Sequence, residues 1–115
     1  MDKDDRQLLL TTAWLFAMHG QSARARTLCE ALVEGDPKDG VAALALADLM
    51  LDAGEAKEAL SVIRAADCPG GLERAAALLE TKALALAGKR AEADRRWSRY
   101  VAAARGETRK WVKEA

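Results

Sequence analysis

Three stretches of the sequence share one pattern: FAMHGQSARA at residues 16–25, MLDAGEAKEA at 50–59 and LALAGKRAEA at 84–93. Each begins with a large apolar residue, has a glycine four positions later and ends with an alanine five positions after the glycine. The three glycines, Gly20, Gly54 and Gly88, are spaced by 34 residues. A fixed period of this length indicates a protein built from repeated structural units.

The same period relates positions on both sides of the glycine. Apolar or small residues recur seven positions before it and nine and twelve positions after it: Ala13, Ala47 and Thr81, then Cys29, Ile63 and Trp97, then Leu32, Ala66 and Tyr100. A helical hairpin explains this alternation, because the glycine permits the turn and the following alanine lets the two helix backbones approach closely. The period therefore predicts three helical hairpins.

The composition favours an all-α fold. The 26 alanines and 16 leucines far outnumber the 5 valines, 1 isoleucine and 5 threonines. Such a ratio favours helices over strands. Basic and acidic residues number 18 each, so no overall field attracts nucleic acid or an anionic membrane. Residues 1–57 nevertheless hold 6 basic and 10 acidic side chains, whereas residues 58–115 hold 12 and 8.

The apolar pattern and its breaks predict the helix boundaries. We expect helices near residues 6–19, 22–34, 40–53, 56–66, 72–87 and 90–105, with a short seventh at 108–114. Asp39 is a candidate N-cap, and Gly35, Gly40 and Gly106 are expected in or beside breaks. We expect one domain over residues 1–115, with repeats at about 6–37, 40–71 and 74–105 and a C-terminal cap or tail at 106–115.

A 34-residue period with small residues at two fixed places is the pattern of tetratricopeptide repeats (TPR), and the chain resembles that family along nearly its whole length. The resemblance implies a short right-handed solenoid whose concave groove is lined by the first helix of each hairpin. The chain departs from the family pattern in two ways. Leu9, Ala43 and Ala77 stand where a tryptophan is expected, and only Pro37 keeps the closing proline.

Residues suited to catalysis are scarce. A lone His19 cannot form a metal cluster, and the sequence has no glycine-rich phosphate loop. His19 is expected to end a helix, and Cys29 takes the apolar position of Ile63 and Trp97, which predicts core packing. Cys68 lies in a loop before Pro69, where a reactive role stays open. We therefore expect a non-enzymatic protein with no cofactor and no metal.

Helical spacing predicts which side chains face the groove. The predicted partner-binding residues are Leu10, Trp14 and Met18 from the first hairpin, Val41, Leu44, Asp48 and Leu51 from the second, and Leu78, Lys82 and Leu86 from the third. An apolar groove of this kind suits an amphipathic helix or an extended apolar segment. The alternative is that some of these leucines face neighbouring helices. If the groove is open, a bound partner or self-association is expected to cover it.

The tetratricopeptide domains that hold the C-termini of heat-shock chaperones grip a carboxylate with basic and amide side chains at these places. Here Trp14, Asp48 and Lys82 stand at equivalent positions, so that clamp is missing. The last helical segment carries a basic stripe, which we interpret as the solvated flank of a terminal repeat. Its members are Lys89, Arg90, Arg95, Arg96 and Arg99. Nucleic-acid binding through this stripe is the alternative.

The first repeat also resembles a narrower group. The run Leu8-Leu9-Leu10, Trp14, the pair His19-Gly20 and Pro37 are similar to the small YscY-type (SctY) chaperones of bacterial type III secretion systems. This resemblance implies a cytoplasmic bacterial chaperone that holds a small secreted partner of the YscX type. Together the pair would engage the export gate protein. A needle-subunit chaperone and a generic tetratricopeptide scaffold or adaptor are the alternatives.

No targeting or membrane segment is expected. The uncharged stretch from residue 7 to residue 23 contains His19 and Gly20 and follows Asp2, Asp4 and Asp5, where a signal peptide would be basic. The sequence therefore predicts a protein that is not exported, with no direct membrane insertion.

Overall fold

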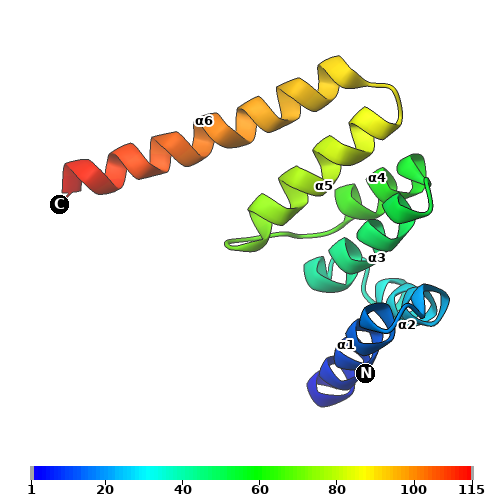
Figure 1. Cartoon of the computed structure of the whole chain (residues 1–115). Helices are drawn as coiled ribbons and strands as arrows, with labels where there is room; N and C mark the ends of the chain where they lie inside the picture. Colours follow the sequence, from blue (N-terminus) through cyan, green and yellow to red (C-terminus); the bar gives the residue numbers. More distant parts are fainter. Residues whose placement is uncertain (1, 115) are drawn as a thin grey trace.

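The computed structural model describes the backbone of residues 2–114 and the side chains of residues 2–106. Its described part forms six helices and no strand: α1 (Lys3–Met18), α2 (Ser22–Gly35), α3 (Gly40–Asp52), α4 (Ala56–Ala65), α5 (Leu72–Leu86) and α6 (Arg90–Glu114). Successive helices pair as hairpins, α1 with α2, α3 with α4 and α5 with α6 (Figure 1). The predicted all-α fold is confirmed.

The turn inside each hairpin has the same geometry. Gly20, Gly54 and Gly88 have φ of +74°, +80° and +81°, a left-handed conformation that strains residues carrying a Cβ. The residue after each glycine donates a backbone hydrogen bond to the carbonyl five positions earlier. These bonds are Gln21 to Phe16, Glu55 to Met50 and Lys89 to Leu84, each 2.8 Å. This is the Schellman ending of a helix, and it explains why the glycine period is visible in the sequence.

The alanine after each turn is buried in the hairpin. Ala25, Ala59 and Ala93 are 1%, 0% and 3% exposed. A larger side chain at these positions would push the second helix of the hairpin away from the first. The repeated alanines therefore have the close-contact position predicted from the period.

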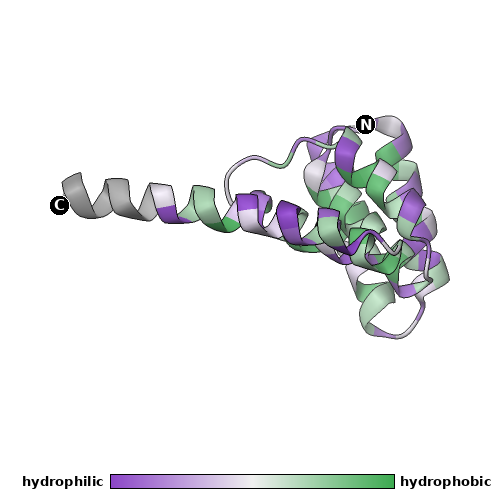
Figure 2. Cartoon of the chain, turned by 90° about the horizontal axis from the view of Figure 1, so that it is seen from above, coloured by the Kyte–Doolittle hydropathy of each residue, from purple (hydrophilic) through white to green (hydrophobic). Residues whose placement is uncertain are grey.

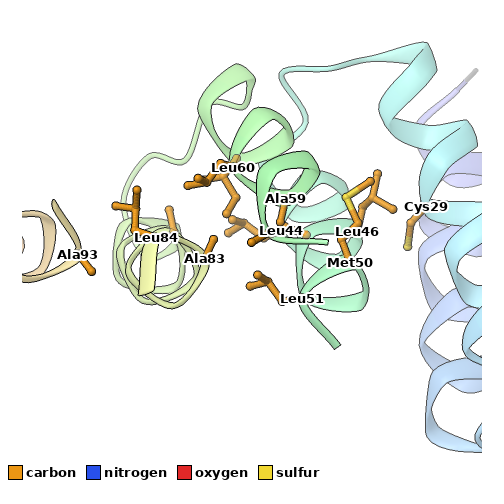
Figure 3. Packing of buried hydrophobic residues seen from close by; sticks show 14 of the residues in the cluster. Cys29, Leu44, Leu46, Met50, Leu51, Ala59, Leu60, Ala83, Leu84 and Ala93 are labelled. Carbon is orange, nitrogen blue, oxygen red and sulfur yellow. The ribbon is translucent and has the colours of Figure 1, made fainter. Parts of the chain in front are cut away.

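The middle hairpin carries most of the core. Helix α3 packs on α2, α4 and α5, and Figure 3 shows Leu44, Met50 and Leu51 between Cys29 of α2 and Ala83 of α5. Leu44 and Leu51, which were expected to line the groove, are only 6% and 5% exposed. They lie in the core because hairpins flank α3 on both sides, so a wider arc of α3 is covered than its own periodicity indicates.

The helix boundaries agree with the sequence except at the two ends of the chain. Helix α1 begins at Lys3, earlier than expected, because the Asp2 carboxylate accepts a hydrogen bond of 2.8 Å from the backbone N–H of Asp5 and caps the helix. The predicted break at Gly106 and the separate seventh helix are wrong, because α6 runs through Gly106 to Glu114. A helical glycine costs about 1 kcal/mol relative to alanine, and no proline adds a second reason to stop.

The molecule is elongated. Its radius of gyration is 15.6 Å, against roughly 13 Å for a compact chain of similar length. Helix α6 has 25 residues and α5 has 15, so α6 extends well past the helix it packs on (Figures 1 and 2).

Candidate partner-binding groove

Two adjoining depressions separate α1 from α3. One has a volume of about 430 Å³ and is lined by Arg6, Gln7, Leu10, Thr11, Trp14 and Val41. The other has about 260 Å³ and is lined by Leu10, Ala13, Trp14, Ala17, Ala25, Cys29, Val41, Ala45, Asp48 and Leu49. Because they share Leu10, Trp14 and Val41, they form one trough, here called the α1/α3 groove.

Helix α2 forms the floor of the α1/α3 groove, because both α1 and α3 pack against it. The floor residues Ala25 and Cys29 are almost fully buried. Burial raises the pKa of the Cys29 thiol, and the nearby Glu30 carboxylate adds to the effect. The thiol therefore stays protonated at neutral pH and acts as an apolar floor residue.

An ion pair fixes one end of the groove. The Arg6 guanidinium of α1 donates two hydrogen bonds to the Asp39 carboxylate, one from Nε and one of 2.7 Å from Nη2. Asp39 also accepts a 3.3 Å bond from the backbone N–H of Ala42 and so caps α3, as the sequence predicted. These contacts, the Arg6 bonds first, hold the pKa of Asp39 below its ordinary value. One carboxylate thus ties the start of α1 to the start of α3.

The structure brings together four of the predicted partner-binding residues. Trp14 and Val41 are 60% and 45% exposed, and they face each other across the groove with the half-buried Leu10. Asp48 lies at the α3 side of the same trough. An exposed tryptophan over an apolar depression can bury a large area against a partner.

The other predicted residues lie elsewhere. Met18, Leu78 and Leu86 are 60%, 48% and 54% exposed but line neither depression. Lys82 is exposed on α5, and the ion pairs among residues 2–106 do not include an Asp48–Lys82 pair. The third hairpin therefore does not continue the α1/α3 groove.

Two exposed leucines were missed from the sequence. Leu8 and Leu15 are 65% and 46% exposed on α1, outside the smaller depression and its floor. The 34-residue register indicates that both positions belong to a face that packs against other helices, because the equivalent positions in the later hairpins carry small or apolar residues. The register does not show that, among the described residues, α1 packs mainly on α2 and that side of α1 stays uncovered.

A second cleft lies between α4, α5 and α6. It has a volume of about 580 Å³ and is lined in part by Arg64, Cys68, Glu80, Arg96 and Tyr100. The Glu80 carboxylate lies 3.5 Å from Nε of Arg64 and 3.1 Å from Nε of Arg96, so Arg96 of the basic stripe is already paired. Burial raises the pKa of Cys68, as does the neighbouring Asp67, which disfavours the reactive thiolate.

The described residues contain neither a candidate metal cluster nor a candidate membrane-spanning helix. No group of three or more His, Cys, Asp or Glu side chains there is placed to hold a metal ion. None of the described helices combines the length and the apolar character needed to span a membrane.

Comparison with known proteins identifies the repeat. Residues 16–67 match the family model for the tetratricopeptide repeat, a segment that runs from the end of α1 through α4. The comparisons with curated proteins and with solved structures gave no significant match. The matched segment contains the first two glycine turns and the floor of the α1/α3 groove. The chain thus carries a tetratricopeptide-repeat segment, and its fold is a short helical-repeat solenoid.

Proposed function

We propose that this protein is a non-enzymatic binding module that holds an apolar helix or extended segment of a partner protein in the α1/α3 groove. The observation that carries the proposal is Trp14, which is 60% exposed beside Leu10 and Val41 in a preformed trough. Leaving a tryptophan in water forgoes the free energy of its burial, and exposed apolar surface of this kind marks interaction sites. Tetratricopeptide repeats are protein-binding scaffolds, which supports the same reading.

The finer proposal is a chaperone of the YscY type that shields a small YscX-like secreted protein in the bacterial cytoplasm and helps to present it to the export gate. This finer proposal is supported by where the residues that carry the resemblance lie in the fold. The leucine run and Trp14, which give the first repeat its likeness to these chaperones, are on the helix that forms one wall of the groove. A generic adaptor needs only the repeat fold, whereas a chaperone needs an open apolar site such as this one.

Replacing Trp14 by alanine tests the site. We expect Trp14→Ala to weaken partner binding by at least about 2 kcal/mol, roughly thirtyfold, because truncating a central aromatic anchor typically costs this much. Since Trp14 is mostly exposed, the thermal melt followed by circular dichroism should change little. The partner is identified by coexpression with candidate small secreted proteins and mass spectrometry of what co-purifies.

Leu86→Ala is the matched control, because Leu86 is 54% exposed on α5 and lines neither depression. It should leave partner affinity within about threefold. Equal losses in both variants would contradict a site at the α1/α3 groove. A Trp14 variant that unfolds would show that the ring supports the fold instead.

A further inference from the structure

One carboxylate in the wall of the α1/α3 groove has no cation beside it. Of the residues that line the two depressions, only Arg6 and Asp48 are charged. The Arg6 guanidinium is already paired with the Asp39 carboxylate. Asp48 is exposed, and the ion pairs of residues 2–106 do not include it. Within the described part of the chain, the groove is thus an apolar trough with one uncompensated negative charge.

This charge lies at one end of the groove. The two walls run in the same direction, because the Arg6–Asp39 pair joins the starts of α1 and α3. Ala17 and Asp48, which come late in the two helices, line the smaller depression together. Asp48 is about 14 Å along α3 from Asp39, at 1.5 Å per helical residue. One end of the groove is therefore closed by a neutral ion pair, and the other carries a free carboxylate.

The helix ends add negative potential at the Asp48 end. The C-terminus of a helix carries a partial negative charge, and α1 and α3 end at Met18 and Asp52, within about one turn of the residues that line the smaller depression. The last turns of these two fully described helices contain no basic residue. Arg24 of α2 lies over the Phe16 ring and lines neither depression. This end of the groove therefore attracts a cation.

We propose that the partner segment held in the α1/α3 groove is cationic, with a lysine or arginine beside its apolar face that pairs with Asp48. This inference rests on the proposed function and names the chemical class of its partner. An occupant that fills the smaller depression removes water from around Asp48, and a carboxylate that loses water without gaining a partner is costly. A basic side chain supplies that partner, whereas an acidic segment adds repulsion. Trp14 then provides buried area, and Asp48 determines which segments are accepted.

The acidic excess of the groove-forming part of the chain favours the same partner. Residues 1–57 hold 6 basic and 10 acidic side chains, although the whole chain has no net charge. A local excess of one sign speeds the approach of a segment of opposite sign, and salt weakens this effect. A cationic segment is therefore expected to associate faster at low salt than a neutral one with the same apolar face.

Two synthetic amphipathic peptides of equal length test the charge of the partner. They share leucines at positions i, i+3, i+4 and i+7 and differ only in the residues that flank this face, which are lysines in one and glutamates in the other. Binding of each labelled peptide to the full chain is measured by fluorescence anisotropy at several salt concentrations. We expect the lysine peptide to bind at least about fivefold more tightly at low salt, and this preference should shrink as salt rises.

Variants of the chain assign the preference to one carboxylate. Asp48→Asn, which keeps the shape of the side chain, should remove most of the preference for the lysine peptide, and Asp48→Lys should reverse it. Asp94 provides the matched control, because it is an exposed carboxylate on α6 that lines neither depression of the groove. Asp94→Asn and Asp94→Lys should leave the preference within about twofold.

The Trp14→Ala variant separates a failure of this inference from a failure of the groove. Equal affinity for the two peptides, lost together in Trp14→Ala, would overturn the cationic partner and keep the groove. A preference for lysine that the Asp48 and Asp94 variants reduce equally would also overturn it. If neither peptide binds, or if Trp14→Ala leaves their binding unchanged, the groove is wrong and this inference falls with it.

Discussion

Gly40 begins α3 at a place where two linkers meet. A Cβ atom at this position would overlap the backbone carbonyl oxygen of Asp67 and press on Leu72. The Asp67 backbone N–H in turn donates a 3.0 Å hydrogen bond to the carbonyl of Lys38. The linkers on either side of the middle hairpin are thus held together at a residue that has no side chain.

Replacing Gly40 by alanine should therefore destabilise the protein although alanine is the better helix former. We expect a loss of about 1 to 3 kcal/mol in the free energy of unfolding, because the overlapping atom is backbone and cannot rotate away. Urea denaturation measures it. Gly35→Ala is the control, since Gly35 is also at a helix end but has nothing within 4 Å of an added Cβ. Equal stability of the two variants would argue against the close approach.

Thr81 has a buried hydroxyl without a hydrogen-bond partner in the described part of the chain. Thr12 and Thr27 donate theirs to the carbonyls of Leu8 and Ala23, at 2.8 and 3.0 Å. The positions equivalent to Thr81 in the other hairpins are Ala13 and Ala47, both buried. The third repeat thus carries a polar atom where the register favours a methyl group.

Thr81→Ala should raise the free energy of unfolding by about 0.5 to 1 kcal/mol. Removing an unpaired buried hydroxyl and gaining helix propensity together outweigh the roughly 0.8 kcal/mol lost with one methyl group. The shift of the urea midpoint measures this gain. Thr81→Val, which keeps the methyl group but not the hydroxyl, should not be less stable than wild type. A clear loss in both variants would mean that the hydroxyl is satisfied.

At the scale of helices, Asp39 joins two elements through a single carboxylate. It caps α3 and accepts two bonds from Arg6 of α1, and its side chain is only 8% exposed. A second interhelix pair, Arg26 of α2 with Glu55 at the start of α4, lowers the pKa of Glu55 in the same way. Neighbouring hairpins are thus linked where a helix begins.

The lowered pKa of Asp39 predicts how stability depends on pH. The contribution of Asp39 is complete above the ordinary carboxyl value of 3.8 and is lost as pH falls through the lower value of the folded state. Asp39→Ala should cost about 1 to 2 kcal/mol at pH 7, and the difference from wild type should shrink as the pH falls below the ordinary carboxyl value and through the lower pKa of the folded state. Urea denaturation at several pH values measures it. Asp52→Ala, at an exposed carboxylate of the same helix, should show little loss, and a difference for Asp39→Ala that does not vary with pH would contradict the assignment.

The elements differ in how well the sequence predicted them. The three hairpin turns were predictable because a left-handed glycine and the alanine after it are local requirements that recur with the period. The end of α6 was not, because Gly106 alone is a weak signal and helix formers continue on both sides of it. Asp2 was missed as a cap because the first apolar position comes several residues later.

At the scale of the whole molecule, the groove was predicted only in part. Trp14 and Val41 were placed correctly on the surface, but Leu44 and Leu51 were not, since the covered arc of a helix depends on how many neighbours it has. Helix α3 has neighbours on both sides, and α1 has them on one side only. The same difference leaves Leu8 and Leu15 exposed, which no property of α1 alone could reveal.

The charge asymmetry along the chain leads to a prediction about the basic end. Changing Arg95 and Arg99 to glutamine should leave partner affinity within about threefold, because exposed charges far from a site contribute little. Arg96 stays unchanged so that Glu80 keeps its partner. Binding is measured by titration at several salt concentrations. Duplex nucleic acid that binds wild type with a steep salt dependence, and not the variant, would show that the stripe is a binding site.

The uneven burial of the hairpins also sets an order of opening. Helix α1 has a single buried residue, Ala13, whereas α3 has eight. Local unfolding requires least free energy where the fewest side chains are buried, so we expect backbone amides of α1 to exchange with deuterium long before those of α3. One wall of the α1/α3 groove is therefore its most labile element. A partner that binds there must hold α1 folded, which costs it the entropy of ordering the helix and slows the exchange of the α1 amides.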